Sequence, residues 1–227
     1  MKRGFSILAI VTALLLSFAL YEALIAAPTE RTMGDVQRIF YYHVPSAWTA
    51  FLLFLINFVA SVVFLIRRDT KADILALVTA EVCVVFCTVV MATGPIWARP
   101  VWGIWWTWDL RLTLTLVLWL IYVSYLVLRR FSTSSQTPVL ASVLAIFGAL
   151  DVPLVYFSIW FFRTQHPSPV IGGGGSLDPR MAHVLLINWA AFLCLAWLVC
   201  WTRFRLEVLE REVEEAQALE SLLEGSR

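Results

Sequence analysis

The sequence predicts an all-α integral membrane protein, a bundle of six transmembrane helices with the N and C termini on the cytoplasmic side. Three observations support this prediction. The 227 residues are 60% hydrophobic and only 15% charged, whereas a soluble domain has roughly 45–50% apolar and about 25% charged residues. Six stretches are long enough to cross a bilayer, which takes about 20 mostly apolar residues. Basic residues are also divided unevenly between the two sides of these stretches.

The six expected spans take up most of the chain and leave no separate soluble domain. They cover residues 5–27, 44–66, 74–93, 112–128, 139–160 and 181–202. Helices are expected because a spanning helix satisfies its own backbone hydrogen bonds in lipid. The first stretch exceeds the roughly 7–15 residues of a signal-peptide core, which favours a retained span.

The domain organisation follows from the positions of these spans. We expect one membrane domain over residues 1–205, with a tryptophan-rich external loop at 94–113. Residues 206–227 form an amphipathic cytoplasmic tail, with apolar side chains along one side of a helix.

The distribution of charge predicts the orientation. Of the 17 lysines and arginines, most fall on the side that holds both termini. These are Lys2, Arg3, Arg67, Arg68, Lys71, Arg129, Arg130, Arg203, Arg205, Arg211 and Arg227. Lysine and arginine accumulate in cytoplasmic loops, so this side is expected to be cytoplasmic. The net charge of +1 gives no reason to expect nucleic acid as a partner.

The cysteines exclude some kinds of site. All four, Cys83, Cys87, Cys194 and Cys200, fall within expected spans, and none forms a Cys-x-x-Cys pair. A disulfide framework and a zinc site are therefore not expected. The absence of Cys-x-x-Cys-His also means that the chain does not attach a c-type haem of its own.

Three longer connections share the other side of the membrane and hold most of the chemically distinctive residues. They span residues 28–43, 94–111 and 161–180. Two histidines, His43 and His166, lie in different connections, on either side of the tryptophan cluster in sequence. Tryptophan also collects at membrane interfaces, and a single interfacial histidine is usually a surface residue. Four tryptophans within WGIWWTWDLRLT exceed that simpler expectation.

Together these groups suit a planar ligand that carries a metal and carboxylates. Indole faces cover a flat apolar ring, and neutral imidazoles occupy axial positions on a metal. Arg38 and Arg111 match carboxylate geometry. Haem meets all three requirements. Gly103 would let the backbone approach the ring, and Asp109 would orient Arg111 or an indole N–H.

The segment WGIWWTWDLRLT resembles the tryptophan-rich signature of the haem-handling proteins of cytochrome c biogenesis, and most closely that of the CcmC family. The matching residues are Trp102, Gly103, Trp105, Trp106, Trp108, Asp109, Arg111 and Thr113. The segments RIFYYHVPSAW, GPIWARPVWG, FRTQHPS and SLDPRM follow in the order expected for that family, so the resemblance covers nearly the whole chain.

The resemblance implies a carrier of haem b (iron protoporphyrin IX), not an enzyme, in the bacterial inner membrane with its site facing the periplasm. His43 and His166 match the family's presumed axial ligands. Arg38 and Arg111 match its propionate-binding arginines, and Trp97 matches an aromatic residue near the ring. The implied partners are the haem chaperone CcmE, the ATP-binding cassette subunits CcmA and CcmB, and the small membrane protein CcmD.

Other functions stay open at this point. A CcsA-type cytochrome c synthase subunit shares the motif but usually has more spans and further histidines. A membrane enzyme could use the indoles as a platform for a lipid-linked substrate, with Asp109 as a base. A transporter is supported only by the number of spans and by Glu81, an acid inside the third span. We expect Glu81 to be protonated or hydrogen-bonded within the bundle, and we have no match for Asp151 in the family pattern.

Overall fold

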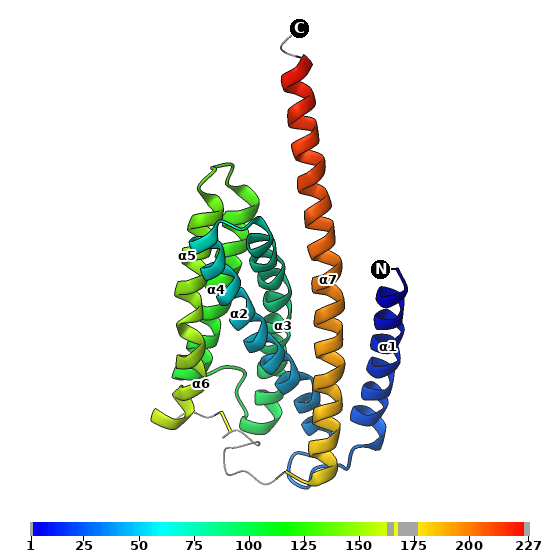
Figure 1. Cartoon of the computed structure of the whole chain (residues 1–227). Helices are drawn as coiled ribbons and strands as arrows, with labels where there is room; N and C mark the ends of the chain where they lie inside the picture. Colours follow the sequence, from blue (N-terminus) through cyan, green and yellow to red (C-terminus); the bar gives the residue numbers. More distant parts are fainter. Residues whose placement is uncertain (1, 163–165, 168–176, 225–227) are drawn as a thin grey trace.

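The computed structural model describes residues 2–162, 166–167 and 177–224, and these residues form helices and no strand (Figure 1). The α-helices are α1 (Lys2–Tyr21), α2 (Phe40–Arg67), α3 (Thr70–Trp102), α4 (Leu110–Phe131), α5 (Thr137–Ala149), α6 (Asp151–Phe161) and α7 (Pro179–Glu224). A π-helical turn η1 (Glu22–Ala26) and a 3-10 helix η2 (Asp35–Ile39) lie between α1 and α2.

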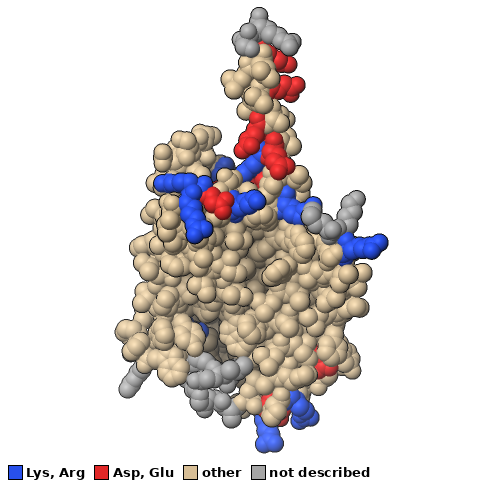
Figure 2. Space-filling model, in the orientation of Figure 1, with Lys and Arg blue, Asp and Glu red and all other residues tan. Residues whose placement is uncertain are grey.

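Six helical segments are long and apolar enough to cross a membrane, which confirms the predicted all-α membrane bundle with six spans. One of them combines α5 and α6, which meet at Leu150. Both ends of the chain lie at the same end of the bundle (Figure 1). A broad band without visible charge separates the charged ends of the molecule on the face seen in Figure 2, as a membrane-crossing protein requires.

Two helices extend further than the sequence analysis predicted. We expected residues 94–111 to be an external loop, but α3 continues to Trp102 through Pro95 and Pro100. Proline removes a backbone donor, yet transmembrane helices tolerate it where neighbouring groups satisfy the freed carbonyl. Similarly, α2 begins at Phe40, so His43 lies in a helix and not in a connecting loop.

The core lies between α2, α3, α4, α5 and α6, with α7 packed against α2 and α3 and with α1 outside α7 (Figure 1). Tyr122 of α4 is fully buried. Its hydroxyl lies 3.1 Å from Oδ1 of Asn57 in α2 and 3.3 Å from the carbonyl of Ala145 in α5. Since lipid offers no hydrogen-bond partners, these contacts fix three helices to one another. The four cysteines are free thiols, as expected.

The fifth span is broken next to Asp151, where the sequence LDVPL contains a proline. Pro153 has no N–H to continue the helical ladder, and α5 gives way to α6 at this level. Asp151 is buried, and its Oδ2 atom has no hydrogen-bond partner among the described residues.

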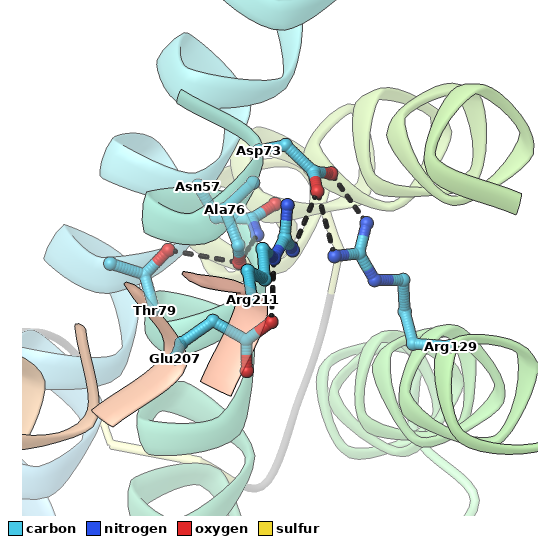
Figure 3. Close-up of polar contacts among 7 residues, drawn as sticks. All are labelled: Asn57, Asp73, Ala76, Thr79, Arg129, Glu207 and Arg211. Atoms are coloured by element: carbon cyan, nitrogen blue, oxygen red, sulfur yellow. Dashed lines mark hydrogen bonds and ion pairs between the residues drawn. The ribbon is translucent and has the colours of Figure 1, made fainter. Parts of the chain in front are cut away.

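A buried carboxylate ties three helices together near the end of the bundle that holds the termini. Asp73, in the first turn of α3, accepts hydrogen bonds from Arg129 of α4 at 3.0 Å and from Arg211 of α7 at 2.9 Å (Figure 3). Only 2% of its side chain is exposed. Two guanidinium groups thus compensate one desolvated carboxylate, and loss of either partner would leave a buried charge incompletely paired.

The same pattern of charges continues along α7 toward the membrane centre. Glu207 accepts from Arg211 at 2.9 Å and lies 4.0 Å from Arg203, which in turn donates two hydrogen bonds to Glu81, at 2.8 and 2.9 Å. The acid that we expected to be satisfied inside the bundle is therefore hydrogen-bonded to an arginine. We call this set the ion ladder; its members are Asp73, Glu81, Arg129, Arg203, Glu207 and Arg211.

The close contact between Gly148 of α5 and the side chains of α4 gives a testable prediction. A methyl group at Gly148 of α5 would lie 2.8 Å from Ile121 Cγ2 and 2.9 Å from Tyr122 Cε2. Because Tyr122 is held by its hydrogen bonds, we expect Gly148→Ala to destabilise the protein by about 1–3 kcal/mol through overpacking. The thermal midpoint of unfolding, followed by circular dichroism in detergent, measures this effect.

Gly4→Ala is the matched control. Nothing lies within 4 Å of a methyl group at Gly4, and alanine favours a helix over glycine by up to about 1 kcal/mol. The thermal midpoint should therefore stay the same or rise. Equal midpoints for Gly148→Ala and the parent protein would show that α4 and α5 can separate without cost.

Candidate functional site

A cavity of about 200 Å³ opens at the end of the bundle opposite the termini. It lies between the start of α2, the end of α3, the start of α4 and the helix α6. Most of its wall is apolar, with a few polar groups among aromatic side chains, which is typical of sites for small molecules and cofactors. The wall residues used below are Phe40, His43, Trp97, Trp102, Trp106, Arg111 and His166.

The cavity brings together two histidines that are far apart in the sequence. His43 lies in the first turn of α2 and is 7% exposed, and His166 follows α6. Their ring centroids are 6.4 Å apart, and the ring planes meet at 34°. The two side chains therefore approach one another across the cavity from separate segments.

Hydrogen bonds determine which nitrogen of His43 carries the proton. Its Nδ1 atom lies 2.8 Å from Thr93 Oγ1, and that hydroxyl lies 2.6 Å from the carbonyl oxygen of Val89. A carbonyl only accepts, so the single hydroxyl proton of Thr93 is donated to Val89. Thr93 Oγ1 must then accept from Nδ1–H of His43, and in the neutral ring the lone pair is on Nε2.

His166 has the same arrangement through a different acceptor. Its Nδ1 atom lies 2.9 Å from the carbonyl oxygen of Pro167, which can only accept. Burial, together with the positive charge of Arg111, lowers the pKa of His166 from 6.5 to about 4. The ring is therefore neutral near pH 7, with its proton on Nδ1 and its lone pair on Nε2.

The tryptophans of the cluster divide into two groups. Trp97, Trp102 and Trp106 line the cavity, and Trp97 also packs against His43 with ring centroids 6.0 Å apart. In contrast, Trp105 is 59% and Trp108 is 74% exposed. The structure thus brings three of the five candidate indoles to the cavity and leaves two on the outer surface.

Gly103 ends α3, with its backbone in the left-handed region at φ 78°. Its N–H donates to the carbonyl of Arg99, and the Arg99 side chain donates to the carbonyl of Gly103. Nothing lies within 4 Å of the position of a Cβ atom there. Glycine is therefore favoured here by the positive φ angle of the backbone and not by a lack of space for a side chain.

Asp109 begins α4 as its N-cap. Its Oδ1 atom accepts from the backbone N–H of Leu112 at 3.0 Å. This cap fixes the first turn of the helix, which carries Arg111 at the wall of the cavity. Arg111 is half-buried and lies 3.5 Å from the carbonyl of Val155. Among the described residues, it forms no salt bridge.

The structure does not bring Arg38 to the cavity. Its guanidinium donates to the carbonyl of Ala23 at 2.9 Å and to Asp35 at 3.2 Å, and so links η1 to η2. His183, in α7, also lies outside the described cavity wall. The proposed role of Arg38 at a ligand thus stays a prediction.

Sequence reasoning missed Thr93 as a partner of His43. The only signal was a threonine directly before Gly94-Pro95, in a segment that we took for the end of a span. It also missed Phe40, whose ring packs against Trp97 and lies at the cavity wall. Both depend on α2 and α3 being helical beyond the predicted ends of the spans.

Known proteins resemble this chain over most of its length. The family model described as Heme exporter protein C matches residues 1–219. The chain belongs to the CcmC family. It is 34% identical over 217 residues to Heme exporter protein C of Bradyrhizobium diazoefficiens, covering 94% of this chain and 82% of that protein. The resemblance predicted from the tryptophan motif is thereby confirmed.

Two further relatives of the CcmC family extend the comparison. Heme exporter protein C of Escherichia coli is 29% identical over 202 residues, which cover 88% of this chain and 82% of that protein. A putative cytochrome c biosynthesis ccmC-like mitochondrial protein of Marchantia polymorpha is 31% identical over 182 residues, with 80% and 78% covered.

The guanidinium at the cavity gives a prediction for the protein without ligand. Arg111 is half-buried and has no salt bridge among the described residues, so the attraction of nearby Asp109 offsets only part of its desolvation free energy. We therefore expect Arg111→Met, which keeps the length and apolar stem, to raise the thermal midpoint of the ligand-free protein. Arg111→Lys, which keeps the charge, should bring no such gain. A lower midpoint for Arg111→Met would show that the guanidinium stabilises the empty cavity.

Proposed function

We propose that this chain binds haem in the cavity and presents it at the periplasmic face to the haem chaperone CcmE during cytochrome c maturation. The names of its relatives support a role in haem export and cytochrome c biogenesis. The observation that carries the finer proposal is the convergence of His43 and His166 across the cavity, 6.4 Å apart between ring centroids.

This spacing suits two imidazoles on one iron. A metal–imidazole bond is roughly 2 Å long and each nitrogen lies about 1 Å from its ring centre, so two axial rings have centres about 6 Å apart. The Nδ1 hydrogen bonds of His43 and His166 leave each lone pair on Nε2. Metal-binding histidines usually donate the other ring N–H in this way.

The remaining groups of the cavity match the other parts of haem. Trp97, Trp102 and Trp106 offer apolar faces to the macrocycle. Arg111 offers a cation to a propionate, which would form the direct ion pair that the guanidinium does not make with any described residue. Arg38 could serve the second propionate only after leaving Ala23 and Asp35. Haem b is the form of haem that we propose.

The cavity also suits temporary binding. Its volume of about 200 Å³ is below the roughly 300–1,000 Å³ of typical small-molecule sites, so the described walls enclose only part of a macrocycle. We infer that the remaining edge is offered to the chaperone, next to Trp105 and Trp108, which are exposed. Gly103 and Asp109 then hold the backbone of this segment in place. Asp109 is engaged as a helix cap, which argues against its use as the base of an enzyme.

The distribution of charge and the family support the proposed orientation and partners. Lysine and arginine gather at the end of the molecule that holds the termini (Figure 2), and such residues accumulate on the cytoplasmic side. The cavity then faces the periplasm, and the chain spans the bacterial inner membrane. We propose that CcmA and CcmB supply ATP hydrolysis and that CcmD joins the complex, so that this chain acts as a carrier and not as an enzyme.

Histidine variants test the proposal directly. Purified protein supplied with haem should show a Soret band, and His43→Ala and His166→Ala should each lower haem affinity by at least about tenfold, because an axial bond is lost. Absorption titration in detergent measures both. His183→Ala is the matched control, since His183 is not at the cavity wall. This variant should bind haem with the affinity of the parent protein. Unchanged spectra in both test variants would refute the ligand assignment.

Thr93 tests the role of the hydrogen bond behind His43. Thr93→Val keeps the shape but removes the acceptor for Nδ1–H, so the ring loses its fixed orientation and tautomer. We expect haem affinity to fall by about 10–100-fold, as for other outer partners of metal ligands. Thr93→Ser keeps the hydroxyl and should retain affinity near that of the parent. If valine and serine variants bind haem equally well, the hydrogen bond has no part in binding.

A further inference from the structure

We propose that the projecting end of α7 binds a helix of a partner protein that carries an apolar seam flanked by lysine and arginine. This surface lies at the end of the molecule opposite the cavity, and it is independent of the proposed haem site. The proposal rests on three features of the described residues: a rigid anchor, an exposed apolar seam and a one-sided charge.

The ion ladder anchors the projecting helix. Arg211 reaches Asp73 in the first turn of α3, so this contact marks the end of the bundle. The helix continues to Glu224, and 13 further residues extend roughly 20 Å beyond that level at 1.5 Å per residue. Figure 1 shows this end of α7 standing clear of the other helices. An anchored helix keeps its direction, which lowers the entropic cost of binding a partner.

An apolar seam follows the projecting helix. Its members recur at spacings typical of a helical pairing face, and they are Leu206, Leu209, Val213, Ala216 and Leu223. At 100° per residue, the seam lies on the face opposite Glu207, which is held by arginines of the ladder. Leu209 is 52%, Val213 is 55% and Leu223 is 60% exposed. The bundle therefore cannot cover this seam.

From residue 212 onward the charge beside the seam is negative, whereas Arg205 lies beside its first member, Leu206. Residues 212–224 contain five glutamates and no lysine or arginine, and Figure 2 shows acidic side chains along the projecting helix. The positions flanking the seam include Glu210, Glu212 and Glu224, and Glu220 falls within it.

The negative charge of the projecting helix favours one kind of partner over the others. A second copy of the helix would set glutamate against glutamate, which disfavours pairing. Anionic lipid headgroups would repel the helix in the same way, since surface helices that bind such lipids are usually basic. A basic amphipathic helix would pack its apolar side chains against the seam and pair its lysines and arginines with the flanking glutamates.

A designed pair of peptides tests this preference on the full-length protein in nanodiscs. Each fluorescent peptide has about three heptads with leucine at the seam positions; one carries lysine and the other glutamate at the flanking positions. Fluorescence anisotropy should show binding of the lysine peptide that weakens as salt is added. The glutamate peptide should not bind. Equal binding of the two peptides, or binding of neither, overturns the proposal.

Variants connect the binding to the seam. Val213→Asp should lower the affinity for the lysine peptide by at least about tenfold. Leu222→Asp, on another face of the same helix, should change this affinity by less than about twofold. The double variant Glu210→Lys, Glu212→Lys should reverse the preference toward the glutamate peptide. Equal losses in the Val213 and Leu222 variants would overturn the assignment of the seam.

Two other measurements identify the alternative occupants. Sedimentation that reveals a dimer of the parent protein, lost in Val213→Asp, would show that a second copy covers the seam. Amide hydrogen exchange that becomes slow over residues 206–224 only in anionic nanodiscs would show that lipid covers it. Either result overturns the proposal of a basic partner helix.

Discussion

Hydrocarbon offers no hydrogen-bond partner, and this constraint determines where polar side chains lie in the protein. Within the core, the hydroxyl of Tyr122 forms a hydrogen bond with the side-chain oxygen of Asn57. At one end of the bundle, the ion ladder neutralises charges that would otherwise be costly to bury. At the other end, the histidines are held by an oxygen atom at each Nδ1. The hydrogen bonds and ion pairs that join different helices are therefore concentrated in a few places.

The two histidines are held in different ways. His43 is part of α2, and its ring is fixed by a hydroxyl from α3, so both of the helices that pack most extensively contribute to its position. His166 instead uses the carbonyl of the residue that follows it. One side of the cavity is thus built into the bundle, and the other belongs to a connection.

The sequence was sufficient for the six spans and the family because both depend on signals within short windows: apolar stretches of the right length and the motif WGIWWTWDLRLT. It was insufficient where two segments had to be placed in space. Residues 94–111 were predicted to be a loop between two spans, but α3 runs on through Pro95 and Pro100 to Trp102. Arg38 matched a propionate-binding pattern, yet its nearest acceptors are Ala23 and Asp35. Thr93 gained meaning only when α3 was placed beside His43.

The ion ladder has a consequence for the response of the protein to voltage. Its three acids and three arginines sum to zero formal charge. An electric field across a membrane acts on net displaced charge, at about 2.3 kcal/mol per elementary charge per 100 mV. A motion that carries α3, α4 and α7 together keeps these pairs intact and moves no net charge of the ladder through the field. The ladder should therefore add no voltage dependence to such a motion.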